Sequence, residues 1–265
     1  MNTHTTSCEN SFRQILWKFE ENKNFTYVRF GDGDLFMIFD TYKEDSQPDG
    51  TVGKWNRFEV TPKLQSELTE AFNIVDDNYM VASVMNQSNN EIDMIGSNDR
   101  LVNSYGENVS NGKLVHKDWF FHHFVFIHSF ANYFSGEWKY HNLGFKEMIE
   151  KFIKPKKVMY VSGYHTDEFK NLFGNVDCFI ETPKQNSYET IDEWYPKLLE
   201  KSFDMDVVLL ATGFSSRVVA KRLWNDNRNL QVLDLGSIVD GLRKNYNRLW
   251  LQRYQESFEK YDGGE

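Results

Sequence analysis

The chain has 265 residues, of which 40% are apolar and 16% aromatic, with five prolines and sixteen glycines. This length and composition exclude a disordered or fibrous protein and suit one large domain with a sizeable core. A net charge of −9 disfavours nucleic acid as a partner, and two distant cysteines give neither a disulfide framework nor a zinc signature.

No pattern for export or membrane insertion is evident. The first residues lack a basic segment followed by an apolar one, so we expect no secretion signal. The most apolar window, residues 119–133, is broken by three histidines and is too short to cross a bilayer. Because Cys8 and Cys178 fit a reducing compartment, we expect a cytoplasmic protein.

The first elements are predicted by apolar spacing. Residues 11–21 have a helical pattern that Ser11 could cap. Residues 25–30 are rich in β-formers and predict a strand that runs directly into Gly-Asp-Gly-Asp, with a helix over 35–39. The polar stretch 42–59 predicts an exposed excursion that could form a lid.

Thr61 followed by Pro62 marks the start of a helix that runs to about residue 76, and a strand follows over 79–85. Residues 86–117 are dense in Asn, Ser, Asp and Gly and predict loops, before an aromatic helix over 118–134.

The C-terminal half alternates short apolar runs with helical patterns. The expected strands are 158–161, 176–180, 207–210 and 232–235, and the expected helices are 145–153, 187–201 and 215–224. Near-continuous apolar runs suit strands that are buried on both faces of a parallel sheet. We therefore predict an α/β protein with a Rossmann-like, mostly parallel sheet flanked by helices, as a single domain over 1–265 with an acceptor-side insertion around 86–142.

Polar groups follow several of the predicted strands, where ligands bind in open α/β sheets. Asp32 and Asp34, separated by one glycine, can present oxygens to one hard cation such as Mg²⁺ or Mn²⁺, which can neutralise a diphosphate. Gly31 and Gly33 let the backbone bend around such a ligand. The alternative is an ordinary Asp-Gly-Asp turn, in which Arg29 merely pairs with the acids instead of reaching a phosphate.

The segment from Gly213 through Ser215 and Ser216 follows a predicted strand and opens a predicted helix. Its backbone N–H groups and helix dipole could hold a phosphate. The segment matches no Walker or Gly-x-Gly-x-x-Gly pattern, and it also fits an ordinary helix N-terminus.

Taken in order, three blocks resemble the GT-D-type glycosyltransferases. The first is similar to the family's Arg-Phe-Gly-Asp-Gly-Glu block, with Asp34 in place of Glu. The second resembles its Pro-Ser-Lys-Asn-Ala turn, with Gln185 inserted, and the third its Leu-Gly-Pro-Thr-Ala and Asp-Ile-Gly-His segments, with Ser237 in place of His. The blocks read Val28-Arg29-Phe30-Gly31-Asp32-Gly33-Asp34, Thr182-Pro183-Lys184-Gln185-Asn186-Ser187-Tyr188, and Leu209 to Ala220 with Leu233-Asp234-Leu235-Gly236-Ser237.

The resemblance implies a UDP-sugar donor, often glucose, and a requirement for Mn²⁺ or Mg²⁺. Together with the residue patterns it assigns the metal to Asp32 and Asp34, and donor binding to Arg29, Gly31, Gly33, Lys184, Asn186, Gly213, Ser215, Ser216, Asp234 and Gly236. The implied acceptor is a glycan, a glycoprotein or another hydroxyl compound, in the setting of polysaccharide biosynthesis. If the reaction inverts the anomeric centre, Asp240 or Asp234 could be the base.

Some features have plainer interpretations. His122, His123 and His128 lie in the aromatic segment and are expected to be packed side chains, since no ligand partners stand at defined spacing. The basic stretch from Arg243 to Arg248 could attract an anionic acceptor or a membrane surface, or be a solvated helix face.

Three alternatives to a glycan-modifying transferase remain. One is a non-catalytic nucleotide-sugar or carbohydrate-binding module. A second is a phage-type glycosyltransferase acting on modified DNA bases, which the acidic charge disfavours. A third is a Rossmann-type methyltransferase, disfavoured because its glycine-rich loop belongs after the first strand.

Overall fold

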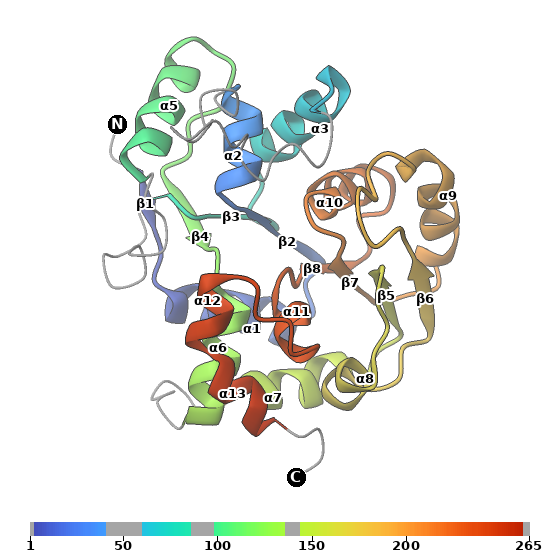
Figure 1. The fold of residues 1–265 in the computed structure, drawn as a ribbon. Coiled ribbons are helices and arrows are strands. Elements are labelled where there is room, and N and C mark those ends of the chain that lie inside the picture. The colour runs from blue at the N-terminus through green and yellow to red at the C-terminus, as the bar shows by residue number, and fades with distance from the viewer. Residues whose placement is uncertain (1–2, 41–59, 86–97, 136–143, 262–265) are drawn as a thin grey trace.

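A computed structural model describes residues 3–40, 60–85, 98–135 and 144–261 of the chain, and these residues form one β-sheet between two layers of helices (Figure 1). Within this described part, eight strands pair in the order β1-β4-β3-β2-β8-β7-β5-β6, and every pairing is parallel. The α/β class and the parallel sheet expected from the sequence are confirmed.

The strands are short and mostly buried. They are β1 His4–Thr5, β2 Phe25–Phe30, β3 Tyr79–Ser83, β4 Trp119–His122, β5 Val158–Ser162, β6 Cys178–Glu181, β7 Val207–Ala211 and β8 Gln231–Asp234. In the central pairing, Tyr27 of β2 is in register with Leu233 of β8. All parallel strands end at one edge, so the turns after β2, β8, β7, β5 and β6 share that edge.

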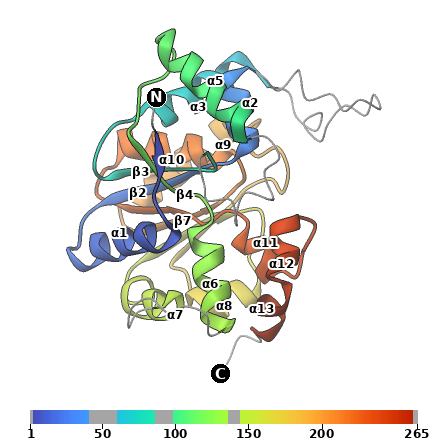
Figure 2. The same cartoon turned by 90° about the vertical axis from the view of Figure 1, so that its left-hand side faces the viewer.

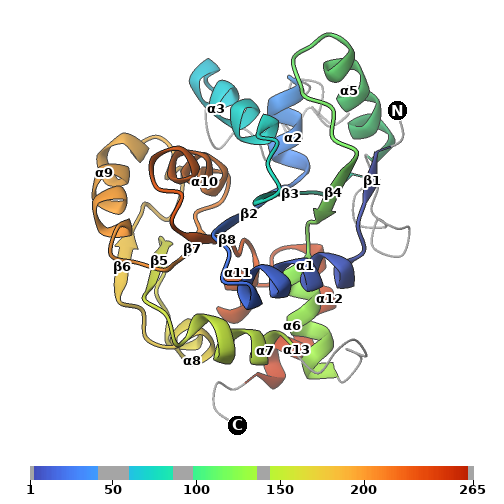
Figure 3. The ribbon, with the colours of Figure 1, turned by 180° about the vertical axis from the view of Figure 1, so that it is seen from behind.

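The helices form a layer on each face of the sheet, as Figures 1 and 3 both show. One layer holds α2 Asp32–Phe39, α3 Pro62–Asn73, α5 Asn98–Ser110, α9 Ile191–Ser202 and α10 Ser215–Asp226. The other holds α1 Cys8–Glu20, α6 Val125–Ser135, α7 Phe145–Met148 continued by the π-helix Ile149–Ile153, α8 Asp167–Phe173, α11 Ile238–Leu242, α12 Leu249–Arg253 and α13 Gln255–Lys260. Figure 2 shows α2 and α11 toward the same end of the sheet, where β2 runs into α2.

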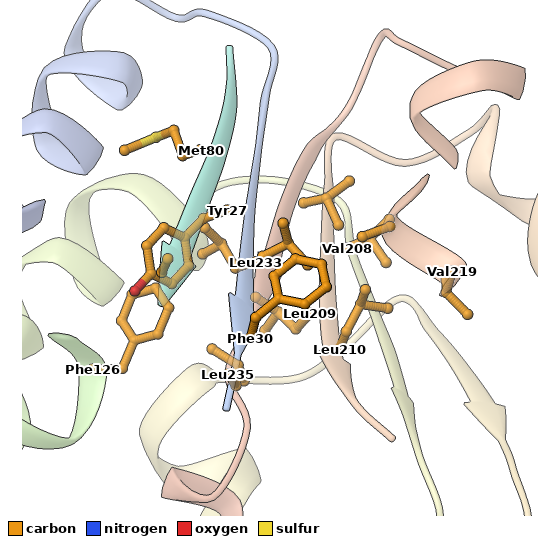
Figure 4. Packing of buried hydrophobic residues seen from close by; sticks show 14 of the residues in the cluster. Tyr27, Phe30, Met80, Phe126, Val208, Leu209, Leu210, Val219, Leu233 and Leu235 are labelled. Atoms are coloured by element: carbon orange, nitrogen blue, oxygen red, sulfur yellow. The ribbon is translucent and has the colours of Figure 1, made fainter. Parts of the chain in front are cut away.

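Side chains from both faces of the central strands build the core (Figure 4). On one side of β2, the rings of Tyr27 and Phe126 meet edge to face with their centroids 5.2 Å apart. On the other side, the rings of Phe30 and of Phe72 in α3 meet edge to face with their centroids 5.1 Å apart. Because both faces are covered, these strands appear in the sequence as continuous apolar runs.

Most of the predicted elements are found, and two predictions are wrong. The segment 118–134, expected to be one helix, starts as strand β4 before α6 begins at Val125. Residues 86–117, expected to be loops, contain the helix α5. The pairing of β4 with β3 and β1 explains the first error, because a strand gains its ladder from residues far away in the chain.

Smaller differences concern element ends. Helix α1 starts at Cys8 with Ser7 as its cap, whereas the predicted cap Ser11 is buried and accepts the N–H of His122 at 2.8 Å. Strand β1 and helices α8, α11 and α13 were not predicted.

Two expectations concern segments of which the structure describes only a part or no residues. The excursion over 42–59 lies outside the described residues. Within 86–142, the described residues form α5, β4 and α6, and β4 belongs to the sheet itself.

No helix in the described part of the chain is both long and apolar enough to span a bilayer, in agreement with the sequence.

The predicted cap of α3 allows a stability test. The Thr61 hydroxyl accepts the N–H of Leu64 at 3.1 Å. Thr61→Ala should lower the free energy of unfolding by about 1 kcal/mol, because a helix N–H loses its acceptor. Thr61→Ser keeps the oxygen and should stay near wild type in a urea titration; equal loss in both variants would contradict the cap.

Candidate active site

The turn from β2 into α2 places the two predicted metal-binding acids in different surroundings. Gly31 is the N-cap of α2, so both acids lie in the first helical turn, where the helix dipole favours negative charge. Asp32 is exposed, and its Oδ1 accepts the N–H of Gly33 at 2.9 Å. Asp34 is buried, and its Oδ2 accepts the N–H of Gly31 at 2.8 Å.

Arg217 of α10 joins this turn to the end of β8. Its Nη2 lies 2.9 Å from Asp34 Oδ2, and its Nη1 lies 3.3 Å from Asp234 Oδ2. Nη1 also donates to the carbonyl of Gly213 at 2.6 Å. One guanidinium therefore ties together α2, β8 and the turn after β7.

Arg29 of β2 completes the buried cluster. Its backbone N–H donates to Asp234 Oδ2 at 3.2 Å, its Nε lies 3.8 Å from the same oxygen, and its Nη1 donates to the carbonyl of His123 at 3.1 Å. Its guanidinium packs on Gly236, whose φ is +54° and where a Cβ would lie 1.2 Å from Arg29 Nη2. Glycine is therefore required here for both its conformation and its lack of a side chain.

We call Arg29, Asp34, Arg217 and Asp234 the buried charge cluster. Its two arginines balance its two carboxylates, and each residue is at most 6% exposed. Burial raises the pKa of Asp34, while Arg217 and the Gly31 N–H oppose this rise. Burial also lowers the pKa of Arg29, against the attraction of Asp234. Both arginine Nε atoms and Asp234 Oδ1 lack hydrogen-bond partners among the described residues.

His123 lies against the same turn, and its place in the site was not predicted. Its Cε1 would be 3.5 Å from a Cβ on Gly31. Burial first, and then the positive charges of Arg29 and Arg217, hold the pKa of His123 well below its usual range, which favours the neutral ring. The sequence signal for His123 is its position directly after the apolar run 119–122, which is strand β4 and not the start of the predicted helix.

The turn after β7 offers main chain rather than side chains to a ligand. Gly213 is exposed, has a φ of +64° and has open space where a Cβ would stand. The Ser215 hydroxyl is paired with that of Ser187 at 2.8 Å, and the Ser216 hydroxyl accepts the N–H of Thr212 at 3.1 Å. Both predicted serines are buried, so their side chains shape the turn.

Lys184 and Asn186 lie at the far side of the same edge. They belong to the turn after β6, and β8, β7 and β5 lie between β2 and β6. Four strand spacings correspond to about 19 Å. Asp32 and Lys184 are therefore too far apart to bind one phosphate, although an extended ligand could contact both. Asn186 has a φ of +52°.

Asp240, the predicted base, lies in α11 and is partly exposed. Its carboxylate oxygens lie 3.8 Å from Arg243 Nη1 and 3.9 Å from Arg248 Nε. Burial raises its pKa, and the two arginines oppose this rise. Asp234, the other candidate, is fully buried and paired with both arginines of the buried charge cluster, so no acceptor can reach it.

Of the two acids, only Asp32 is free to contact a cation that is shared with a substrate. The described residues contain no group of three or more His, Cys, Asp or Glu side chains able to hold a metal by themselves. Mg²⁺ bound with nucleotides usually takes one or two carboxylates, the phosphates and water. The exposed Asp32 can supply such a carboxylate, whereas Asp34 is engaged by Arg217 and Gly31.

The solved structures that resemble this chain all belong to one kind of domain. No protein-family model matches the sequence, and no curated protein matches it either. Among solved structures, the chain is similar to a glycosyltransferase of domain of unknown function 1792 from Streptococcus sanguinis, with 18% identity, a TM-score of 0.59, and coverage of 95% of this chain and 85% of that one.

Two further structures of that domain, one described as having a distinct glycosyltransferase fold, match at 17% identity. Their TM-scores are 0.60 and 0.56, and each match covers 89% of this chain and 79% of the other. The fold implied by the resemblance to GT-D-type glycosyltransferases is therefore confirmed.

The buried charge cluster predicts a large effect for one substitution. Arg217→Gln leaves Asp34 and Asp234 facing Arg29 alone, and should lower the free energy of unfolding by about 3–5 kcal/mol. Arg13→Gln, which breaks an exposed pair with Glu9, should cost less than about 1 kcal/mol. Urea titrations that give equal losses would contradict a structural role for the cluster.

The loss in Arg217→Gln should also depend on pH. Without Arg217, burial raises the pKa of Asp34 further above its unfolded value. Such a carboxyl destabilises fully above its folded-state pKa, and the penalty disappears below the unfolded pKa. The deficit relative to wild type should therefore be smaller at about pH 4 than at about pH 8. A deficit independent of pH would show that the loss of Arg217 does not raise the pKa of Asp34.

Proposed function

We propose that the chain is a nucleotide-sugar-dependent glycosyltransferase that uses Mn²⁺ or Mg²⁺. One observation carries the proposal: the exposed carboxylate of Asp32 and the open main chain at Gly213 lie at the carboxyl edge of the sheet, and Arg217 links the Gly213 turn to Asp34 in the same helical turn as Asp32. A hard cation and a diphosphate need an exposed carboxylate and backbone donors side by side. The fold shared with solved glycosyltransferases supports the same assignment.

The donor is a UDP-sugar, with glucose or a related hexose as the transferred group, as the family resemblance implies. Its diphosphate lies between Asp32 and the Gly213 turn at the start of α10. When bound, the cation offsets negative charge on the diphosphate. The dipole of α10 adds a partial positive charge at the same place.

The buried charge cluster positions the donor-binding groups without contacting the donor. Arg217 holds Asp34, and Asp34 holds the N–H of Gly31, which fixes the first turn of α2 and hence Asp32. The same arginine fixes the carbonyl of Gly213. Preorganised groups cost no reorganisation when charge develops in the transition state.

During transfer, the bond from the anomeric carbon to the diphosphate oxygen breaks, and a bond to the acceptor oxygen forms. Negative charge grows on the leaving diphosphate, so groups that stabilise it lower the barrier. If the anomeric configuration is inverted, Asp240 takes the acceptor proton, because it is partly exposed whereas Asp234 is sealed. A retaining reaction requires no such base.

The acceptor is a hydroxyl of a glycan or glycoprotein, and the region 86–142 supplies its binding surface. The net charge of −9 opposes DNA as the acceptor. Cys8 and Cys178 are free thiols, which supports a reducing compartment such as the cytoplasm.

The test of the donor site is Asp32→Asn. Transfer or donor hydrolysis with a UDP-sugar panel should require Mn²⁺ or Mg²⁺ in wild type and fall at least about 100-fold in the variant, because a neutral amide holds the cation poorly. Asp40→Asn, at the exposed C-cap of the same helix, should remain active. Unchanged activity in Asp32→Asn excludes this role; binding without turnover by wild type would instead favour a nucleotide-sugar-binding module.

Asp240→Asn tests the base. Burial raises the pKa of Asp240, so kcat/KM should rise with pH through a value above that of an ordinary aspartate. The variant should lose this dependence and about 100-fold or more in kcat, while the exposed Asp204→Asn control keeps both. A product that retains the donor's anomeric configuration, measured by NMR, would remove the need for this base.

A further inference from the structure

A cavity of about 780 Å³ lies between α5 and the outer strands of the sheet, on the side of β2 that faces away from β8. Figures 1 and 3 both show α5 beside β1 and β4. One face of α5 forms a wall of the cavity, with Val102, Asn103, Gly106, Glu107 and Ser110 at helical spacing. We call this space the α5 cavity, and its volume is in the range of small-molecule sites.

Gly106 is the unusual residue of this wall. A glycine inside a helix lowers helix stability relative to alanine. The backbone does not require it, because Gly106 lies within α5 and is not among the glycines with positive φ. Close packing does not require it either, since no atom of the described residues lies within 4 Å of the position of its Cβ, whereas a Cβ on Gly241 would lie 2.3 Å from Phe258 Cζ. Gly106 therefore keeps space open at the cavity wall.

The polar groups around the cavity are mostly uncharged. Asn103, Ser110 and Asn111 offer amides and a hydroxyl, Glu107 offers a carboxylate, and the described lining contains no Lys, Arg or His. The side chains of Asn103 and Glu107 are exposed, and neither has a hydrogen bond or ion pair with another described residue. Such a lining opposes an anion and suits a ligand with neutral hydroxyl groups, which can donate to the carboxylate and pair with the amides.

Apolar side chains form the base of the cavity. Met85, Tyr105 and Phe120 are each at most 3% exposed. The Tyr105 hydroxyl is already engaged, because it donates to the carbonyl of Val115 at 3.3 Å and accepts the N–H of Lys117 at 2.7 Å. A fixed apolar base below a few polar groups is the usual construction of a small-ligand site.

The α5 cavity lies within reach of the candidate active site. Ser83 at the end of β3 is in register with Phe30 of β2, so Met85 follows at the same edge of the sheet as the turn that carries Asp32. Helix α5 also packs against α2, which begins at Asp32. Strands β1 and β2 are three strand spacings apart, which corresponds to about 14 Å. A glycan of several sugar units can therefore occupy the cavity and present a hydroxyl near Asp32.

We propose that the α5 cavity binds a neutral sugar unit of the acceptor glycan. A helical glycine that contributes nothing to packing, beside uncharged groups that make hydrogen bonds, is explained by a ligand that needs the space. The donor diphosphate is not this ligand, because the described lining offers it no cation. Assigning the sugar to the acceptor rests on the proposed glycosyltransferase function, whereas carbohydrate binding itself does not.

The first test is retention of the wild-type protein on an array of immobilised neutral and acidic oligosaccharides. Neutral members should be retained and acidic ones should bind less, because the Glu107 carboxylate repels an anion. Calorimetry with the neutral oligosaccharide that binds best then gives the affinity. Retention of no neutral member would overturn the proposal, as would a preference for acidic ones.

Two substitutions of Gly106 test the space itself. Gly106→Leu fills it and should weaken binding at least about tenfold. Its melting temperature should not fall, because leucine favours a helix and the position of its Cβ is open. Gly106→Ala adds one methyl group and should bind nearly as wild type does. Gln14→Leu adds an exposed leucine to α1 in the other helix layer and should leave binding unchanged.

Glu107→Gln tests the polar wall. It should weaken binding about tenfold, because a hydrogen bond to a charged group is stronger than one to a neutral amide. Glu20→Gln makes the same change at an exposed position of α1 and should have no effect. Affinity equal to wild type in Gly106→Leu would overturn the proposal; if that variant melts below wild type, equal affinity in Glu107→Gln overturns it instead.

Transfer assays separate this proposal from the proposed function. The KM for the bound oligosaccharide as acceptor should rise in Gly106→Leu by the same factor as its dissociation constant, and an unchanged KM would overturn the acceptor assignment. Glycan binding without turnover of any UDP-sugar by wild type would contradict the proposed function and leave the sugar site in place. Turnover by wild type with equal glycan affinity in all variants would contradict the sugar site alone.

Discussion

The position of Arg217 between two buried carboxylates is the constraint on which the carboxyl edge depends. Its guanidinium contacts Asp34 of α2, Asp234 of β8 and the carbonyl of Gly213 after β7. Burying four charged groups is costly in desolvation, and a hydrophobic replacement of similar volume would often be as stable. The arrangement is therefore better explained by what it positions than by stability, because three turns acquire fixed relative places through one side chain.

This constraint separates the two acids of the Gly-Asp-Gly-Asp segment. Spacing alone treats Asp32 and Asp34 as equivalent ligands. Because the chain turns into α2 at Gly31, the two side chains leave the first helical turn in different directions, one into solvent and one toward Arg217. One acid is thus exposed, where the proposed cation could reach it, and the other sets the geometry of the first.

The sequence could predict what is determined locally. The apolar runs of β5, β7 and β8, the Thr61 cap and the turn after β2 follow from composition and spacing over a few residues. Strand β4 could not be recognised, because its Trp-Phe-Phe-His sequence also fits a helix and its pairing with β3 and β1 decides. The role of Arg217 was likewise hidden, since its carboxylate partners lie 183 residues before it and 17 residues after it in the chain. Acidic residues in a turn can be recognised from the local sequence, but the distant arginine that pairs with them cannot.

The two charged groups on the carboxyl edge are held by different physical means, and this difference bears on what each can do. The buried charge cluster is neutral overall and sealed from solvent, so it can fix geometry but cannot bind. A second group on the same edge, Arg243 and Lys184, lies at the Tyr164 ring, so the places of these two cations depend on Tyr164 and on the turn after β6. About 19 Å separates the strand that leads to Asp32 from the strand that leads to Lys184, which is more than one phosphate can span. Under the proposed function, only an extended substrate, or two substrates that meet end to end, would contact both ends of this edge.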